Sequence, residues 1–348
     1  MNILDLLPDT HAGRHTKWLW SRMLAMEAGA RPSLDPAEVA DHFAPSVLDH
    51  VPAEHLVAYF SQLASAIPVV TQLIQETSTS ERYSALLATP TQWLRYRCLT
   101  QATAPHLLIE AAFALALEPT AYSDRRIQRD GRDVLIRDFG GTGPLLLLWH
   151  GAGCDLTCWE SIVPHLAGFH VIAQDLPGHG RSRLSVFTTN DAFTDAGAVI
   201  AEIAEGPPIV VGHSLGGYLG LRYAATGKCS GWIGLDGPFA VVYPWEPDEP
   251  GAPDSVVQIG REIRAVDVVR NLAEMNCPGM LILCSIAANA LEERIVADRQ
   301  ELAKYVARHH PDIRIEWVET GHDTLLFHNP EKTAAWICDW SRKIQFMQ

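Results

Sequence analysis

The sequence carries little positive charge. Only 27 lysines and arginines stand against 41 aspartates and glutamates in 348 residues, which gives a formal net charge of −14. A chain with this balance is a poor partner for the phosphate backbone of nucleic acid or for an anionic membrane surface. We therefore expect neither as its main partner. The charge leaves the identity of a substrate open.

Long apolar runs and paired cysteines are also missing. The longest apolar run, at 107–117, contains Glu110 and is too short to span a bilayer. The N-terminus lacks a basic start before an unbroken apolar segment, so we expect no secretory signal. The seven cysteines include no C-x-x-C pair, and Cys154 and Cys158 near His150 have no second ligand pair at metal spacing. These absences predict a cytoplasmic protein without a disulfide framework or a metal site.

The pattern of the chain changes near residue 122, and its length favours two domains. Asp35 and Pro36 are typical of a helix start, and residues 52–67 have the apolar spacing of a second helix. Four strand-like runs follow them: VTQLIQET, RYSALLAT, WLRYRCLT and HLLIEAAFAL. Helices followed by a run of strands predict an N-terminal α+β domain over residues 1–121.

The stretch HFAPSVLDHVPAEHL in this domain resembles the opening of the ketosteroid-isomerase-like (cystatin-like) domain found ahead of some serine β-lactamase-like proteins. The resemblance covers roughly a quarter of the chain. It implies a cone-shaped α+β domain. We find no acid–base pair in this domain that looks catalytic, so we expect the domain to have a structural or lid-like role.

From residue 122 to 348 strands and helices alternate. A hairpin is predicted to turn at Asp130-Gly131. Short apolar runs separated by helix-length segments then predict a mostly parallel sheet with helices on both faces, whose active site lies at the carboxyl ends of the strands. These runs are PLLLLWHG, HVIAQD, PIVVGH, GWIGLDG, MLILCS and IRIEWVE. The proline-rich and acidic segment at about 238–276 is expected to be a short lid.

The stretch GHSLG places Ser214 between two glycines, after a predicted strand and before a predicted helix. A strand-to-helix turn this tight forces the central residue into a strained conformation, and the glycines relieve the clash. The turn exposes a hydroxyl near a helix N-terminus, where developing negative charge is favoured. We therefore predict Ser214 as a nucleophile rather than as part of a simple packing turn.

A serine nucleophile needs a base and an oxyanion site. His322 follows the last predicted strand, so we expect it to reach Ser214; the competitor is His328, whereas His309 and His310 precede the strand and are expected to be solvated. The backbone amides of Ala152, in the loop HGAG, and of Leu215 are the predicted oxyanion donors. His150 is expected to brace that loop, and His179 to stabilise a turn.

The motifs HGAG, DLPGHGRS, GHSLGG and TGHD, in this order, resemble the α/β-hydrolase fold family over about residues 125–345. This resemblance implies an α/β fold with a nucleophile–histidine–acid triad. The scaffold hosts esterases, thioesterases, lactonases, amidases, perhydrolases and acyltransferases. Serine at the turn argues against the epoxide hydrolases and dehalogenases of the family, which use aspartate there.

The triad acid departs from the commoner family pattern. In much of the family it follows the strand after the lid, but Ser285, Ile286 and Ala287 offer no carboxylate here. Glu292 and Glu293 come only in the next helix. The alternative family position, at the end of the preceding strand, holds Asp236. We therefore expect Asp236 as the acid, with an Asp-Gly turn as the structural alternative.

These residues predict a serine hydrolase that cleaves an ester, thioester or lactone through an acyl-enzyme. An acyltransferase or perhydrolase with the same triad, or a binding protein on the same fold, are the alternatives. A small acyl compound is the expected substrate, with no cofactor, and the oligomeric state is left open. Four aromatic residues are candidates to line its pocket: Trp159, Phe239, Tyr243 and Trp245.

Overall fold

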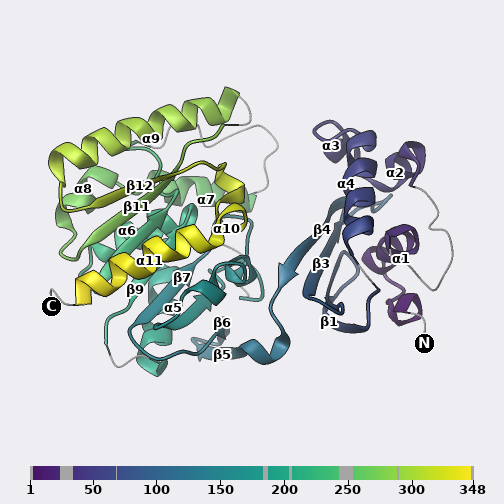
Figure 1. Cartoon of the computed structure of the whole chain (residues 1–348), viewed down its shortest axis with the longest axis horizontal. Helices are drawn as coiled ribbons and strands as arrows, with labels where there is room; N and C mark the ends of the chain where they lie inside the picture. The colour runs from purple at the N-terminus through teal and green to yellow at the C-terminus, as the bar shows by residue number, and fades with distance from the viewer. Residues whose placement is uncertain are drawn as a thin grey trace. The chain divides into compact units, whose positions relative to one another are not determined.

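The computed structural model describes residues 3–23, 34–67, 69–182, 187–203, 206–242, 254–287 and 290–345. The chain divides into two compact units, Met1–Glu118 and Pro119–Gln348 (Figure 1). Each unit has its own sheet and its own hydrophobic core.

The first unit combines short helices with an antiparallel sheet of four strands in the order β1-β2-β3-β4. All four strand-like runs of the sequence form strands, and both predicted helices form. The elements are α1 (His11–Met23), α2 (Pro36–His42), α3 (Pro45–Leu48), α4 (Ala53–Ala66), β1 (Gln72–Ser78), β2 (Arg82–Ala88), β3 (Trp93–Thr100) and β4 (Leu108–Ala116), after a 3₁₀ turn at Ile3–Leu6.

Local signals account for these elements. Asp35 caps α2, because its side chain accepts a hydrogen bond from the Ala37 amide at 2.7 Å and Pro36 starts the helix. On β3, Leu94, Tyr96 and Cys98 alternate with their neighbours and turn into the core of this unit. The predicted helix start is confirmed.

The second unit contains a sheet of eight strands in the order β12-β11-β10-β9-β7-β8-β6-β5. The strands from β12 to β8 in this order run parallel, and β6 and β5 are antiparallel additions. Each predicted strand is present. The bounds are β5 (Ser123–Arg129), β6 (Arg132–Asp138), β7 (Leu145–Trp149), β8 (His170–Gln174), β9 (Ile209–His213), β10 (Gly231–Leu235), β11 (Gly279–Cys284) and β12 (Arg314–Val318).

The predicted hairpin at Asp130-Gly131 is confirmed. Arg129 of β5 pairs with Arg132 of β6, so two residues form the turn. Both have positive φ, 47° for Asp130 and 78° for Gly131, which is the conformation of a type I′ turn.

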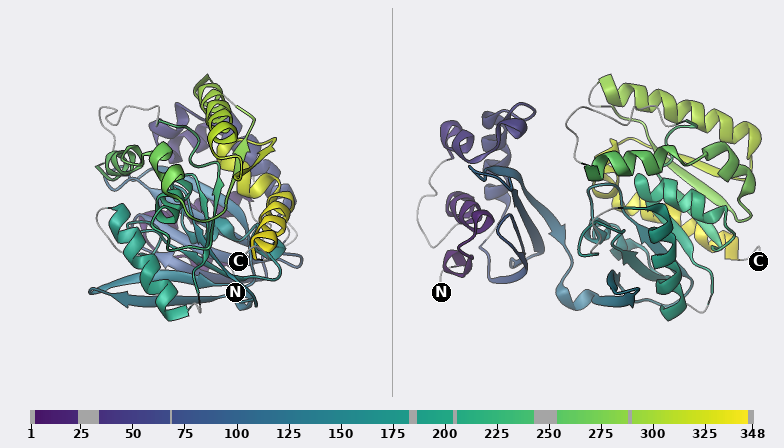
Figure 2. Two further views of the ribbon diagram at one scale, coloured as in Figure 1. Left: turned by 90° about the vertical axis from the view of Figure 1, so that its left-hand side faces the viewer. Right: turned by 180° about the vertical axis from the view of Figure 1, so that it is seen from behind.

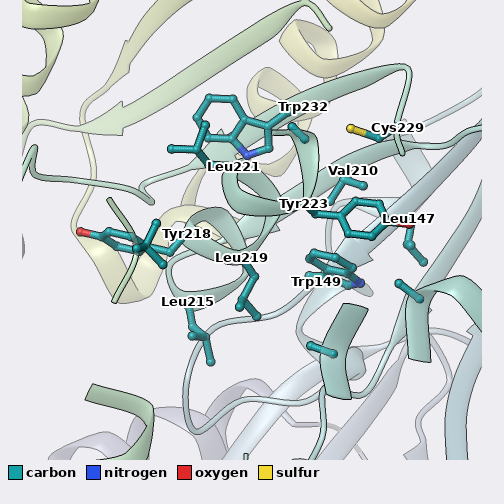
Figure 3. Packing of buried hydrophobic residues seen from close by; sticks show 14 of the residues in the cluster. Leu147, Trp149, Val210, Leu215, Tyr218, Leu219, Leu221, Tyr223, Cys229 and Trp232 are labelled. Carbon is teal, nitrogen blue, oxygen red and sulfur yellow. The ribbon is translucent and has the colours of Figure 1, made fainter. Parts of the chain in front are cut away.

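Helices cover both faces of this sheet (Figures 1 and 2). On one face α5, α6, α8 and α9 pack on the strands, and Figure 3 shows α6 side chains such as Tyr218 and Leu219 in this core with Trp149 and Val210. On the other face lies α11, drawn in yellow. The helices are α5 (Thr189–Ile203), α6 (Leu215–Ala224), α7 (Asp254–Arg264), α8 (Val268–Glu274), α9 (Ala290–His309), α10 (Leu325–His328) and α11 (Pro330–Gln345).

The segment predicted as a lid, 238–276, contains α7 and α8 between β10 and β11. Residues 243–253 of this segment lie outside the described residues. The lid role stays a prediction.

Candidate active site

Ser214 occupies the turn between β9 and α6 and has φ 51° and ψ −116°, a conformation that non-glycine residues rarely adopt. Its amide donates to the Leu235 carbonyl at 3.0 Å, which ties the turn to the next strand. A Cβ on Gly212 would lie 2.0 Å from the Gly216 carbonyl oxygen, and one on Gly216 would lie 2.1 Å from the Trp149 carbonyl oxygen. The two glycines therefore permit the strained turn, as the sequence predicts.

His322 and Asp236 reach Ser214 from two other strand ends. His322 opens a 3₁₀ turn (His322–Thr324) after β12, and its Nε2 lies 2.9 Å from Ser214 Oγ. Its Nδ1 lies 2.6 Å from Oδ2 of Asp236, which follows β10. Because an ionised carboxylate only accepts, Nδ1 donates to Asp236 and Nε2 is left to accept from the serine hydroxyl. The three side chains form one continuous chain of hydrogen bonds.

The competing residues lie elsewhere. His328 is exposed in α10, His309 is exposed at the end of α9, and His310 precedes β12. Glu292 and Glu293 lie in the first turn of α9. Of the candidates that the sequence offers as base and acid, the structure brings His322 and Asp236 together with Ser214.

Asp236 is completely buried and has positive φ of 47°. Its Oδ1 accepts the Cys284 amide at 3.0 Å, and its Oδ2 accepts both His322 Nδ1 and the guanidinium of Arg299. Burial alone would raise the pKa of this carboxyl, but the hydrogen bond from His322 and the charge of Arg299 outweigh it and hold the pKa below its usual range. The carboxylate is therefore charged and fixed in position.

The HGAG loop lies beside the serine, since a Cβ on Gly151 would come within 3.2 Å of Ser214 Cβ. The Gly151 carbonyl accepts from His150 Nδ1 at 2.7 Å and from the Cys154 amide at 3.2 Å. In a trans peptide the N–H points opposite to the C=O, so these two bonds also fix the direction of the Ala152 N–H. Among the described residues, neither the Ala152 amide nor the Leu215 amide has a protein acceptor.

His150 and His179 are structural, as predicted. His150 is fully buried; its Nδ1 donates to the Gly151 carbonyl and its Nε2 accepts the Leu176 amide at 3.0 Å. Burial lowers the pKa of His150 to about 3, so it stays neutral and keeps this bonding pattern. His179 Nδ1 donates to the Pro177 carbonyl at 3.0 Å and stabilises the turn after β8.

Two residues close to Ser214, His322 and Asp236 were not predicted from the sequence. His213 Nε2 donates to the His322 carbonyl at 3.2 Å and so holds the turn that carries the base. Burial lowers the pKa of His213 to about 4. Arg299 lies on α9, where Ile295, Leu302 and Val306 are buried on the same side at spacings of four and three residues. An arginine within that apolar stripe is a signal that could have identified it.

The four predicted pocket aromatics have different outcomes. Phe239 is close to the site, with its ring centroid 6.0 Å from that of His322 and 5.7 Å from that of Tyr218. Trp159 is fully buried in the core under α11, where it packs rather than faces a substrate. This position corrects the prediction for Trp159, since an aromatic in a loop also serves to close a core. Tyr243 and Trp245 lie outside the described residues.

Within the described ranges, no group of three or more histidine, cysteine, aspartate or glutamate side chains is arranged to hold a metal ion. None of the described helices has the length and apolar character needed to cross a membrane.

Comparison with known proteins agrees with the fold. The profile of the "Alpha/beta hydrolase family" matches residues 146–265. Among solved structures, E-2-(acetamidomethylene)succinate hydrolase is similar at 21% identity and a TM-score of 0.50, covering 63% of this chain and 98% of that one. An epoxide hydrolase from Vigna radiata is similar at 14% identity and a TM-score of 0.51, covering 65% of this chain and 100% of that one. The second unit of the chain, 119–348, has the α/β-hydrolase fold.

Curated relatives match a shorter stretch. The lipase LipV of Mycobacterium tuberculosis is 36% identical over 96 residues, which is 27% of this chain and 37% of the relative. An esterase of the same organism is 34% identical over 90 residues, 25% of this chain and 30% of the relative. The magnesium-chelatase 30 kDa subunit of Rhodobacter capsulatus is 34% identical over 98 residues, 27% and 34% respectively. The chain thus spans less than two fifths of the length of these relatives.

The first unit has its own match. The profile "ORF 12 gene product N-terminal" matches residues 7–92. This match does not confirm the ketosteroid-isomerase-like resemblance, which stays a prediction.

Proposed function

We propose that the second unit is a serine hydrolase that cleaves a carboxylic ester, thioester or lactone through an acyl-enzyme on Ser214. The observation that carries the proposal is the chain of hydrogen bonds from Ser214 through His322 to Asp236 at a strained strand-to-helix turn. A hydroxyl is a weak nucleophile unless a base accepts its proton as it attacks. In this proposal His322 Nε2, 2.9 Å from Ser214 Oγ, is that base.

In the first half of the reaction Ser214 Oγ attacks the carbonyl carbon of the substrate, and its proton passes to His322 Nε2. The carbonyl oxygen becomes an anion that the amides of Ala152 and Leu215 stabilise. Each such donor typically contributes about 10²–10³ in rate. The tetrahedral intermediate then expels the alcohol, thiol or lactone oxygen, which takes the proton from His322 and leaves an acyl-serine.

The second half repeats these steps with water. His322 accepts a proton from water, the hydroxide oxygen attacks the acyl carbon, and the released serine oxygen recovers the proton from His322. The carboxylic acid leaves as product. Throughout, Asp236 keeps the imidazole in the tautomer that faces Ser214 and stabilises its protonated form. Apart from substrate and water, these steps balance with groups of the chain alone.

The relatives named lipase and esterase support hydrolysis as the reaction class. Phe239 supports an apolar acyl group in the substrate, because its aromatic ring lies edge-on to the imidazole of the proposed base. We place no catalytic side chain in the first unit and assign it a structural or lid-like role.

Turnover of graded p-nitrophenyl esters, from acetate to octanoate, by the full chain tests the proposal, with thioesters and lactones measured in parallel. We expect hydrolysis by the native protein and its loss in Ser214→Ala. A folded protein that turns over none of these compounds, or a Ser214→Ala variant as active as the native chain, would contradict it. Product analysis with an added alcohol separates hydrolysis from acyl transfer.

A further inference from the structure

Arg299 is a buried arginine whose guanidinium is directed at the triad acid. Its side chain is 1% exposed and that of Asp236 is 0% exposed. The guanidinium donates to Oδ2 of Asp236, the same oxygen that accepts His322 Nδ1 at 2.6 Å. In the part of the chain that the structure describes, Asp236 is its sole acceptor, and Nε has none.

Another buried arginine of this unit shows what a purely structural role looks like. Arg137, also 1% exposed, joins Asp124 to Glu160 and so connects β5 to the loop after β7. Burying a guanidinium is costly, and a second carboxylate helps to offset the cost. Within the described ranges Arg299 contacts one carboxylate, and that carboxylate is the one that contacts His322.

We propose that Arg299 is a positioning residue for the proposed ester hydrolysis: it fixes the carboxylate of Asp236 and, by sharing Oδ2 with His322, weakens the hold of Asp236 on a proton at His322. The proposal rests on the proposed function. Its consequence is that activity extends to lower pH than it would with the same Asp–His pair and no arginine.

The charges of Asp236 and Arg299 determine the direction of the expected pH shift. A proton on His322 is attracted by the negative Asp236 and repelled by the positive Arg299. Removing the arginine charge leaves the attraction and removes the repulsion, so the acid limb of the activity profile should move to higher pH. For two charges that share one carboxylate oxygen in a partly screened site, the expected shift is on the order of one pH unit.

Other groups also face His322. From β9 comes His213, with ring centroids 5.1 Å apart; from β11 comes Cys284, whose Sγ contacts the Gly321 carbonyl; and Asp323 is exposed on the same turn. Burial lowers the pKa of His213 to about 4, and burial raises the pKa of the Cys284 thiol. All three remain in place when Arg299 is substituted, so a difference between variant and native enzyme reports the arginine.

The experiment compares pH profiles of kcat/KM for p-nitrophenyl acetate over about pH 5 to 9. Product is measured at the wavelength at which p-nitrophenol and its phenolate absorb equally. Arg299→Met removes the charge at similar volume, Arg299→Gln removes it but keeps a donor, and Arg299→Lys keeps it. Arg137→Met is the matched control. Active-site titration with a fluorophosphonate expresses each rate per reactive serine, so that partial misfolding does not enter.

We expect the acid limb of Arg299→Met to move to higher pH by about one unit, with kcat lowered about tenfold and KM near the native value. Arg299→Gln should show the same shift, which covers the case in which the methionine variant fails to fold. Arg299→Lys and Arg137→Met should keep the native limb. An unchanged limb in both neutral variants, a shift to lower pH, or an equal shift in Arg137→Met would overturn the proposal.

If the proposed hydrolase function is wrong, the same experiment gives a different result. In that case the native chain itself neither hydrolyses p-nitrophenyl acetate nor takes up the fluorophosphonate. A native enzyme that does both, with neutral Arg299 variants that keep its pH profile, would refute the role of Arg299 alone.

Discussion

Each unit of the molecule contains a short contact to a histidine ring, and the two contacts differ in partner. In the second unit His322 Nδ1 meets a carboxylate, Asp236, at 2.6 Å. In the first unit His15 Nδ1 meets another imidazole, His42 Nδ1, at 2.9 Å. A carboxylate supports a proton on the ring, whereas a second imidazole and burial oppose it. The first arrangement suits a base, and the second favours neutral rings.

Sheet topology explains why, among the described residues, Ser214, His322 and Asp236 come together in the second unit. Its parallel strands bring their carboxyl ends to one edge. Ser214 follows β9, Asp236 follows β10, the Cys284 amide ends β11 and His322 follows β12, and these four strands are neighbours in the sheet. In the first unit the sheet order is the chain order, and alternate strand ends point to opposite edges. The histidines there come instead from α1 and α2.

The largest expected effect comes from changing the partner of His322. Asp236→Asn should lower kcat by about 10⁴ while substrate binding stays near native, because the amide no longer selects the tautomer that faces Ser214. Steady-state kinetics with p-nitrophenyl acetate measure it. Asp195→Asn is the matched control, since Asp195 is also fully buried and bonded to arginines but lies on α5. Near-native turnover in Asp236→Asn would show that the acid lies elsewhere.

A buried ion pair of the first unit provides the next contrast. Arg95, 3% exposed, donates twice to Glu76, at 2.8 and 2.9 Å. Arg95→Met should reduce the free energy of unfolding by about 3 kcal/mol, because it leaves a half-buried carboxylate without this partner. Urea unfolding of the full chain measures the loss.

The same variant should keep native kcat per reactive serine, unlike Arg299→Met. A comparable loss of kcat in Arg95→Met would mean that the first unit contributes to catalysis, and the contrast between the two units would fail.

The smallest expected effect is a loss of folding stability at acid pH. Burial, and then His42, lower the pKa of His15 to about 4, while an unfolded chain has the ordinary value near 6.5. The unfolded state therefore binds more protons between these values, and stability is lost as pH falls through this window. Because His15 is partly exposed, we expect only about 1 kcal/mol from it.

Hydrogen exchange of α1 at pH 7 and pH 5 in the full chain measures this loss, with His15→Asn as the variant in which the pH dependence is smaller. Equal pH dependence in the native chain and the variant would contradict the assignment to His15.

Much of the fold could be predicted because its signals are local. Continuous apolar runs predict the parallel strands, and an Asp-Gly pair, which tolerates positive φ, predicts the hairpin. The two glycines beside Ser214, which avoid a backbone clash, predict the strand-to-helix turn. The proximity of His322 and Asp236 to Ser214 follows from strand ends that share an edge.

Contacts between elements that lie far apart in the sequence could not be predicted. Arg299 lies 63 positions beyond Asp236, and only the packing of α9 on the sheet brings the two together. The role of His213 cannot be predicted from the motif, because the residue before the nucleophile is free to vary there and the role depends on the His322 carbonyl. Trp159 was misjudged because an aromatic residue near a site can face either a ligand or the core, and burial decides between them.

The central claim is that Ser214 is an activated nucleophile, and covalent labelling tests it most directly. The full chain is incubated with a fluorophosphonate, digested and mapped by mass spectrometry. We predict one adduct, on Ser214, that is absent from Ser214→Ala and from protein unfolded before labelling. A folded protein that takes up no label, or one labelled at another residue while Ser214 stays free, would contradict the account.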